Sequence, residues 1–126
     1  MITEKILHRN ICSYIKLQYP KTIFITDSSG IRVSVGEATR LKKLRSCNGI
    51  PDIIIFEPTG LYAGLFLEVK AKTPYRRDGE LYTDQHLREQ KAVIDRLNKL
   101  GYHACFVWNF EMARKIINRY MDEKNN

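Results

Sequence analysis

The 126-residue sequence contains no apolar run approaching the about 20 residues that a membrane-spanning helix needs. Its start, MITEKILHRN, lacks a long apolar stretch behind a basic end and a small-residue cleavage site, so we expect no secretory signal. The three cysteines, Cys12, Cys47 and Cys105, are odd in number and widely spaced, which fits neither a disulfide framework nor a paired zinc motif. The three histidines are isolated, without zinc or HNH-like spacing. These absences argue against a membrane protein, a disulfide-stapled secreted domain and a zinc domain, and they favour a reducing cytoplasm.

The composition is that of one globular domain with an excess of positive charge. Apolar residues make up 44% and charged residues 28%, and the length allows one hydrophobic core but not two. We therefore expect a single domain over 1–121, followed by a frayed tail over 122–126. Lysine and arginine total 21 against 14 acidic residues, a net charge of +7, which favours polyanionic partners such as nucleic acids.

Hydrophobic periodicity and turn residues predict a compact α/β domain without repeats or linkers. Helix caps are expected at Thr3, Thr83 and Asn109, and Gly101 is expected to end a helix. The predicted elements are a helix over 4–18, strands over 22–26 and 31–35 around a turn at 27–30, a basic helix over 37–46, strands over 52–56 and 65–70, a polar surface loop over 73–83, a helix over 84–100, a strand over 103–108 and a helix after 109.

Two of the predicted strands carry a candidate catalytic cluster. Residues two apart in a strand project from the same face, so Glu68 and Lys70 lie together. If the two strands form a hairpin, Asp52 lies opposite Val69, give or take one residue, and a shift of one residue brings Asp52, Glu68 and Lys70 onto one face. Two carboxylates so close repel each other unless a cation lies between them, and one or two carboxylates typically hold Mg²⁺. Such a cation polarises a phosphodiester and activates water, and the Lys70 ammonium orients that water or stabilises charge on phosphorus.

The Glu-x-Lys pattern alone is a weak signal, because the sequence contains it twice. Glu89 and Lys91 repeat it inside a predicted helix, where residues two apart are rotated by about 200° and cannot form one site. We therefore treat Glu89 and Lys91 as an internal control. From the residues alone, the strand pair has two interpretations, a metal site or the solvated face of an ordinary strand.

Further motifs extend the pattern over nearly the whole chain, from Glu4 to about Tyr120. GIPDIIIFEPTG is followed by GLFLEVK and then by a helix that contains REQKAVIDRL and ends at GYHACFVW. This compound pattern resembles the VRR-NUC family of the PD-(D/E)XK nuclease superfamily. The matching positions are Glu4 in the first helix, Gly49–Asp52, Glu68–Lys70 and Gln90.

The resemblance implies a restriction-endonuclease-like fold with an αβββαβ core, in which helices flank a mixed sheet. It implies that Asp52, Glu68 and the backbone carbonyl of Val69 bind Mg²⁺ or Mn²⁺, with Lys70 as the catalytic lysine. For short stand-alone members it implies a homodimer that cleaves branched DNA such as four-way junctions, and many such proteins are encoded by phages and prophages. We therefore expect a metal-dependent DNA endonuclease without a membrane partner. The alternatives are a nuclease for flaps, nicks or simple duplexes, and a non-catalytic nucleic-acid-binding accessory protein.

Two more positions join the catalytic set through the resemblance, and each also has an ordinary structural explanation. Glu4 shares a helical stripe with Leu7 and Ile11 and can face the sheet, but the helix dipole also favours a glutamate at a helix start. Gln90 falls on the apolar face of its helix, where a buried amide needs partners in the backbone or in the site.

Basic residues bracket the candidate carboxylates in sequence. Two such runs offset the acidity of the centre and guide a phosphate backbone to it, although a charge run is also typical of a solvated face. Tyr75 can stack on a base or sugar, or be incidental in its loop. The predicted nucleic-acid-binding residues are Arg40, Lys42, Lys43 and Arg45 before Asp52, and Lys72, Arg76 and Arg77 after Lys70.

Overall fold

The computed structural model describes residues 2–26 and 34–124 of the chain. The order of helices and strands is that of the predicted αβββαβ core, with one helix added between the first two strands and one at the C-terminal end. In the described part of the chain, no helix combines the length and apolarity needed to cross a bilayer. The elements are α1 (Glu4–Gln18), β1 (Phe24–Thr26), α2 (Val35–Leu44), β2 (Ile53–Ile55), β3 (Leu65–Val69), α3 (Gln85–Lys99), β4 (His103–Val107) and α4 (Phe110–Lys124).

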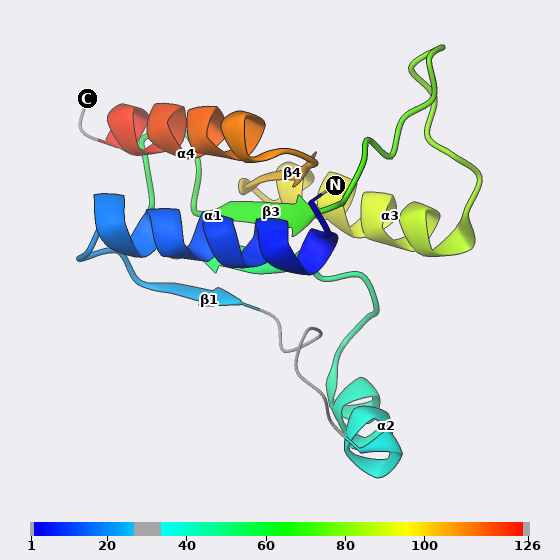
Figure 1. The fold of residues 1–126 in the computed structure, drawn as a ribbon. Helices are drawn as coiled ribbons and strands as arrows, with labels where there is room; N and C mark the ends of the chain where they lie inside the picture. Colours follow the sequence, from blue (N-terminus) through cyan, green and yellow to red (C-terminus); the bar gives the residue numbers. More distant parts are fainter. Residues whose placement is uncertain (1, 27–33, 125–126) are drawn as a thin grey trace.

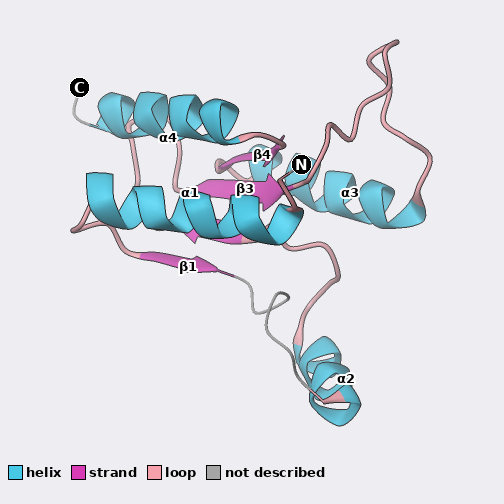
Figure 2. Cartoon of the chain, in the orientation of Figure 1, coloured by secondary structure: helices cyan, strands magenta, loops and turns pink. Residues whose placement is uncertain are grey.

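The strands form one mixed sheet in the order β1-β2-β3-β4. β2 pairs antiparallel with both β1 and β3, whereas β3 and β4 are parallel. A parallel pair needs a crossover connection, which α3 supplies between β3 and β4. α1 and α4 lie side by side against one face of the sheet, and α3 packs on the other face (Figure 1 and Figure 2). The predicted fold class, a mixed sheet flanked by helices, is confirmed.

The larger core lies between the sheet and the α1–α4 layer. Apolar residues recur every four positions in α1, and Leu7, Ile11 and Ile15 are each at most 2% exposed. The predicted cap is confirmed, because the Thr3 hydroxyl accepts a hydrogen bond from the Ile6 N–H (3.1 Å). Burial of each such aliphatic side chain contributes about 1.5–3 kcal/mol. α1 is therefore held rigidly on the sheet, with its first residue at the end of β3.

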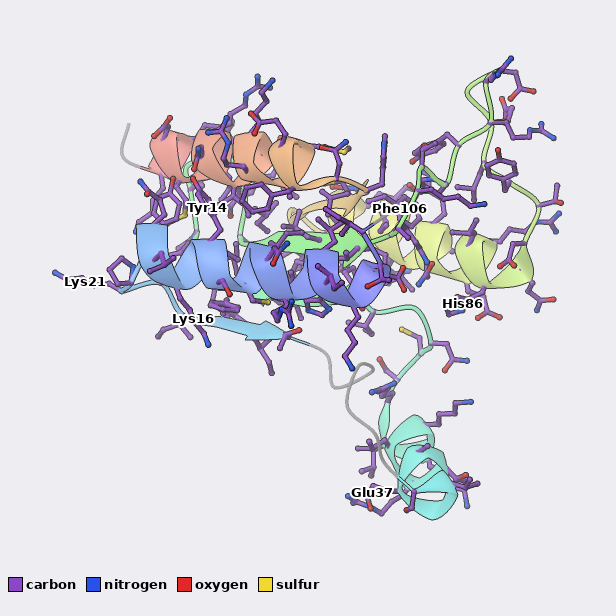
Figure 3. The ribbon with its side chains drawn as sticks, viewed as in Figure 1. Tyr14, Lys16, Lys21, Glu37, His86 and Phe106 are labelled. Atoms are coloured by element: carbon purple, nitrogen blue, oxygen red, sulfur yellow. The ribbon has the colours of Figure 1, made fainter. Side chains whose placement is uncertain are left out.

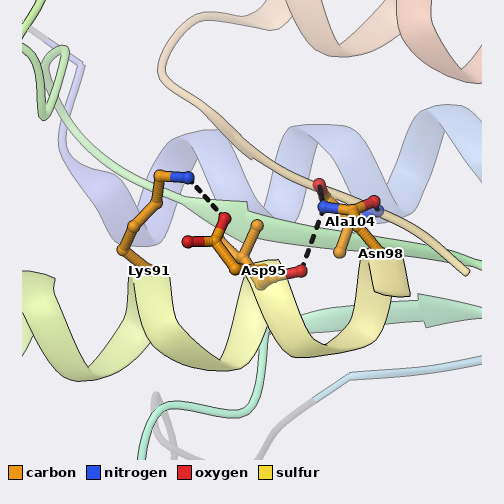
Figure 4. Close-up of polar contacts among 5 residues, drawn as sticks. Lys91, Asp95, Asn98 and Ala104 are labelled. Atoms are coloured by element: carbon orange, nitrogen blue, oxygen red, sulfur yellow. Dashed lines mark hydrogen bonds and ion pairs between the residues drawn. The ribbon is translucent and has the colours of Figure 1, made fainter. Parts of the chain in front are cut away.

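A smaller core lies under α3. Ile94 packs there with Ala104 and Phe106 of β4. The Asn98 amide then joins the two elements, since its Nδ2 donates to the Ala104 carbonyl (2.9 Å) and its Oδ1 accepts from the Ala104 N–H (2.9 Å) (Figure 4). These bonds satisfy the N–H and the carbonyl of Ala104 on the edge strand β4, much as a neighbouring strand would. They fix the position of α3, whose N-terminal half extends past the end of β3.

The β2–β3 hairpin has the predicted form, with a register one residue from the predicted one. Ile53 pairs with Leu67 and Ile55 with Leu65, so the continued register places Asp52 opposite Glu68. β3 is an inner strand covered on both faces, which explains why Glu68 is only 3% exposed although it is charged.

The segment around α2 departs from the prediction. α2 covers Val35–Leu44 instead of 37–46, and the Ser34 hydroxyl caps it by accepting from the Glu37 N–H (3.1 Å). Ser34 and Val35 therefore do not belong to the strand predicted over 31–35, and the remainder of that strand and the turn at 27–30 lie outside the described residues. No residue of α2, all of which the structure describes, is buried, and α2 stands apart from the sheet (Figure 1).

Two other boundaries differ by a few residues. The cap of α3 is Asp84 and not Thr83, because the Asp84 carboxylate accepts from the Leu87 N–H (3.1 Å). Residues 122–124, predicted to belong to a tail, continue α4, while 125–126 lie outside the described residues. The caps predicted at Asn109 and Gly101 are confirmed, by a bond from the Met112 N–H to Asn109 (2.8 Å) and by a φ of 100° at Gly101.

Candidate active site

A cavity of about 540 Å³ lies at the C-terminal end of β3. Its walls come from the start of α1, the end of α2, the turn before β2, the end of β3 and the N-terminal half of α3. These segments are far apart in sequence and meet only because the sheet and α3 are packed as described. The cavity is lined by all the residues proposed as catalytic from the sequence, namely Glu4, Asp52, Glu68, Lys70 and Gln90.

Asp52 and Glu68 form a pair of carboxyl groups, of which Glu68 is buried and Asp52 is partly exposed. The Val69 N–H donates to Oδ2 of Asp52 (2.9 Å), which holds the aspartate beside the end of β3. Burial, reinforced by the hydrogen bond and the negative charge of Asp52, raises the pKa of Glu68 to about 10, against the opposing effect of Lys70. Without a cation, the pair therefore retains a proton at neutral pH.

Lys70 lies on the same face of the strand as Glu68. Its backbone N–H donates to the Val107 carbonyl (2.9 Å), so the pairing with β4 continues past the last residue of β3. This continued pairing keeps the alternation of side chains, and the ammonium group reaches the cavity and favours the charged form of Glu68.

The two carboxyl groups fit a divalent cation of the magnesium class. Mg²⁺ prefers oxygen ligands, keeps several waters and commonly uses one or two carboxylates. A cation between Asp52 and Glu68 would replace the retained proton and remove the repulsion between the two groups. Within residues 2–26 and 34–124, no three His, Cys, Asp or Glu side chains lie close enough together to hold a metal by themselves. Any cation here would therefore draw its remaining oxygens from the backbone, water or a phosphate.

Gln90 presents an unsatisfied oxygen in this cavity. The side chain is 5% exposed, and its Oε1 has no hydrogen-bond partner among the described residues. Its Nε2 lies 3.3 Å from Nε2 of His86. An unpaired buried oxygen costs about 1–3 kcal/mol, which a bound donor would offset. This observation favours a role for Gln90 in the site over a core glutamine bonded to the backbone.

Gly49 allows the turn before β2 to approach α3 closely. Its φ is +88°, and a Cβ there would lie 3.1 Å from the Cα of Gln90 and 3.2 Å from its N. Only glycine meets both conditions without strain. Gly49 thereby sets the separation between Asp52 on the turn and Gln90 on the helix.

Glu4 occupies the first position of α1, above the buried Leu7 and Ile11. It lines the cavity, and its charge also raises the pKa of Glu68. Its side chain is exposed at the helix start, so the helix dipole stabilises it as well.

The predicted basic residues of α2 separate into two groups. Lys42 and Arg45 line the cavity. Arg40 forms an ion pair with Glu37 on the exposed surface of α2, and neither Arg40 nor Lys43 lines the cavity. The segment therefore presents part of its positive charge to the carboxylates and part to solvent.

The loop after β3 also differs from the simplest prediction. Arg76 forms an ion pair with Asp78 (3.2 Å) on the loop, and neither Arg76 nor Arg77 lines the active-site cavity. The ring of Tyr75, considered for base stacking, instead packs edge-on against Phe106 and Trp108, with centroids 6.1 Å and 6.0 Å away.

Several residues of the cavity were given no role from the sequence, and two of them are polar side chains of α3. His86, to which no role was given, and Glu89, chosen as a control, both line the cavity (Figure 3 labels His86). Their spacing from Gln90 is the signal that was present, because positions 86, 89 and 90 share one helical face. Glu89 is therefore unsuitable as a control, whereas Lys91 forms an ion pair with Asp95 and does not line the cavity (Figure 4).

Replacing Glu68 by glutamine should stabilise the metal-free protein at neutral and alkaline pH. The pKa of Glu68 is about 10 in the folded chain and 4.5 ordinarily, so the stability that this group contributes is complete below pH 4.5 and is lost as the pH rises toward 10. Glutamine does not titrate, so its contribution to the stability of the fold does not change with pH. In thermal melts with EDTA, the melting temperature of Glu68→Gln should exceed that of the natural protein by a difference that grows from pH 5 to pH 8. Each kcal/mol of added stability should raise the melting temperature by about 2–8 °C.

Divalent cations provide the control for this melting experiment. Mg²⁺ or Mn²⁺ should raise the melting temperature of the natural protein and have little effect on Glu68→Gln. A constant difference between the two proteins at all pH values would contradict the raised pKa of Glu68.

Comparisons with known proteins agree with this geometry at the level of the fold. No family model matches the sequence, and no curated protein matches it. A solved structure described as a VRR_NUC domain protein superposes with a TM-score of 0.69 and 21% identity, over 96% of this chain and 89% of that one. The chain therefore has the fold of a VRR-NUC domain, as its motifs predicted.

Proposed function

We propose that this protein is a divalent-metal-dependent DNA endonuclease that hydrolyses phosphodiester bonds. The observation that carries the proposal is the pairing of Asp52 with the buried Glu68, with Lys70 on the same strand end, in a cavity that Lys42 and Arg45 border. The fold supports it, because a protein described by the VRR_NUC domain shares this architecture.

We assign each proposed catalytic residue of the cavity a part in phosphodiester hydrolysis. Asp52 and Glu68, with the backbone carbonyl of Val69, are the proposed ligands of Mg²⁺ or Mn²⁺. When bound, the cation supplies the charge that polarises the scissile phosphodiester and activates water for attack on phosphorus. The Lys70 ammonium orients that water or stabilises the negative charge that develops on the phosphate oxygens. Glu4 and Gln90 complete the proposed catalytic set at the edge of the cavity.

The proposed substrate is branched DNA such as a four-way junction. Labelled duplex, nicked, flap and junction DNA incubated with Mg²⁺, Mn²⁺ or EDTA would test both the activity and the selectivity. We expect cleavage only with a divalent cation, and the fastest cleavage on the junction. If duplex, nicked or flap DNA is cleaved faster than the junction, the protein prefers that substrate and is not selective for four-way junctions. Binding without cleavage of any substrate would make the protein an accessory nucleic-acid-binding protein.

Paired cleavage of a four-way junction would require a two-fold dimer. Two symmetric cuts need two active sites, and the described residues of one chain form one such cavity. Light scattering should therefore give about twice the chain mass of 14.8 kDa for the protein alone, or two chains per junction in the complex with DNA. A monomer under both conditions would exclude paired resolution and leave nicking or flap cleavage.

Neutralising Lys42 and Arg45 together should weaken DNA binding and flatten its dependence on salt. Each lost phosphate contact lowers the log–log slope by about 0.9 for duplex DNA, so the double substitution should lower it by about 1–2. Binding titrations at several salt concentrations would measure this slope. Neutralising Arg40 and Lys43, which lie on the same helix but do not line the cavity, is the matched control. If the variant without the charges of Lys42 and Arg45 keeps the slope of the natural protein, α2 does not contact the DNA backbone.

A further inference from the structure

A groove of about 470 Å³ adjoins the active-site cavity beneath the loop that joins β3 and α3. The two hollows share Glu4, Lys70 and His86, so the groove begins at the candidate catalytic residues. Beyond them, its walls include Pro74 and Tyr82, with Lys72 also lining the groove. Ala71, Pro74, Tyr82 and Leu87 make most of the groove surface apolar, although Asp84 also lines it, and one end opens to the place where a phosphate would react.

The loop that forms the wall of this groove is anchored at its base. Tyr75 and Leu81 form an antiparallel bridge and pack into the smaller core, and the Tyr82 N–H donates to the Pro74 carbonyl (3.0 Å). Because side chains alternate along paired segments, Pro74 and Tyr82 project to the opposite side, into the groove. Tyr82 is 47% exposed, on a backbone that these contacts hold in place. Figure 1 shows the loop rising above the N-terminal half of α3.

We infer that this groove binds an unpaired nucleobase of the substrate strand, stacked on Tyr82 beside the scissile phosphate. The inference rests on the proposed function and adds to it the form of the substrate. A volume of about 470 Å³ lies within the range of sites that enclose a small organic group. An exposed aromatic ring offers a base a stacking surface, and Lys70 and Lys72 lie where the flanking phosphates would pass.

The position of Tyr82 favours unpaired over paired bases. In a duplex, both faces of a base are covered by its neighbours and its edge by its partner, so only a base that has left the stack can enter a groove and meet a ring. Among the described residues that line these two hollows, the aromatic rings are Tyr82 and the His86 imidazole. The groove therefore provides a physical basis for preferring branch points, flaps or single strands.

The test compares single-stranded and duplex DNA of the same sequence, each with 2-aminopurine at one position, in EDTA to prevent metal-dependent cleavage. Tyr82→Ala should weaken binding of the single strand about 5- to 150-fold, the equivalent of one base–aromatic stack of about 1–3 kcal/mol. Duplex binding should change less than about 2-fold, and quenching of the 2-aminopurine fluorescence in the single strand should be lost. Tyr82→Phe, which keeps the ring, should retain both binding and quenching.

Phe56→Ala is the matched control, because Phe56 is 54% exposed and lies at the end of β2 away from Asp52. The inference is overturned if Tyr82→Ala binds the single strand normally, or if it weakens single-strand and duplex binding equally. Cleavage of junction and duplex DNA by the natural protein with Mg²⁺ is measured in parallel. Absence of cleavage with a retained Tyr82 effect would reject the proposed function and leave the base-binding groove in place.

Discussion

Asp52→Asn should reduce DNA cleavage by at least about 10²–10³-fold, the loss typical of removing one electrostatic group from an active site, while DNA binding stays equal or becomes tighter. Asparagine keeps the shape of aspartate, and its Oδ1 can still accept the bond from the Val69 N–H that positions this turn. It lacks the negative charge that would hold a cation. Removing a carboxylate beside the DNA also removes repulsion of phosphates, so binding should not weaken. Single-turnover cleavage and a binding titration on one labelled substrate would measure both effects.

Asp95→Asn makes the same chemical change outside the cavity. Asp95 is exposed on α3 and forms an ion pair with Lys91, so its substitution should leave cleavage nearly unchanged. Turnover of Asp52→Asn at the rate of the natural protein would remove Asp52 from the metal site. Equal loss of activity in the two variants would point to a general effect of charge.

Lys70→Ala should also reduce metal-dependent cleavage by about 10²–10³-fold, because the ammonium group lies on the strand face that carries Glu68. Lys91→Ala removes a lysine from the second Glu-x-Lys of the sequence, which lies on a helix and outside the cavity. Its exposed ion pair with Asp95 contributes about 0.3–0.5 kcal/mol, so folding should change little. Cleavage by both variants would be compared at one Mg²⁺ concentration, with circular dichroism as the check of folding.

The outcome that contradicts this site is loss of activity in Lys91→Ala with retention in Lys70→Ala. Glu89→Gln, the partner change in the sequence-based control, is no longer informative as a control, because Glu89 lines the cavity. A partial effect of Glu89→Gln would be compatible with the site.

The strand part of the site could be predicted closely because its geometry is local. The hairpin places Asp52 one residue from the predicted partner, and strand alternation alone puts Glu68 and Lys70 on one face. The residues that α3 contributes to the site were harder to predict. Gln90 was assigned to the site through a family motif, and His86 lies on the same helical face four residues earlier. Which face of α3 meets the end of β3 depends on the packing of Ile94 and the bonds of Asn98.

Local chemistry in the sequence determined the elements, most of their caps, the β2–β3 hairpin and the motifs of the VRR-NUC pattern, because periodicity, capping and pairing act between near neighbours. Tertiary structure decided how α1, α2 and α3 meet around the end of β3, and therefore which charges line the cavity. It gave Arg45 a place in the cavity wall and Arg40 an ion pair on the surface of the same helix. Tertiary structure also packs Tyr75 against Phe106 and places Tyr82 in the groove. The physical reason is that both choices depend on contacts between segments distant in the chain, which no local pattern encodes.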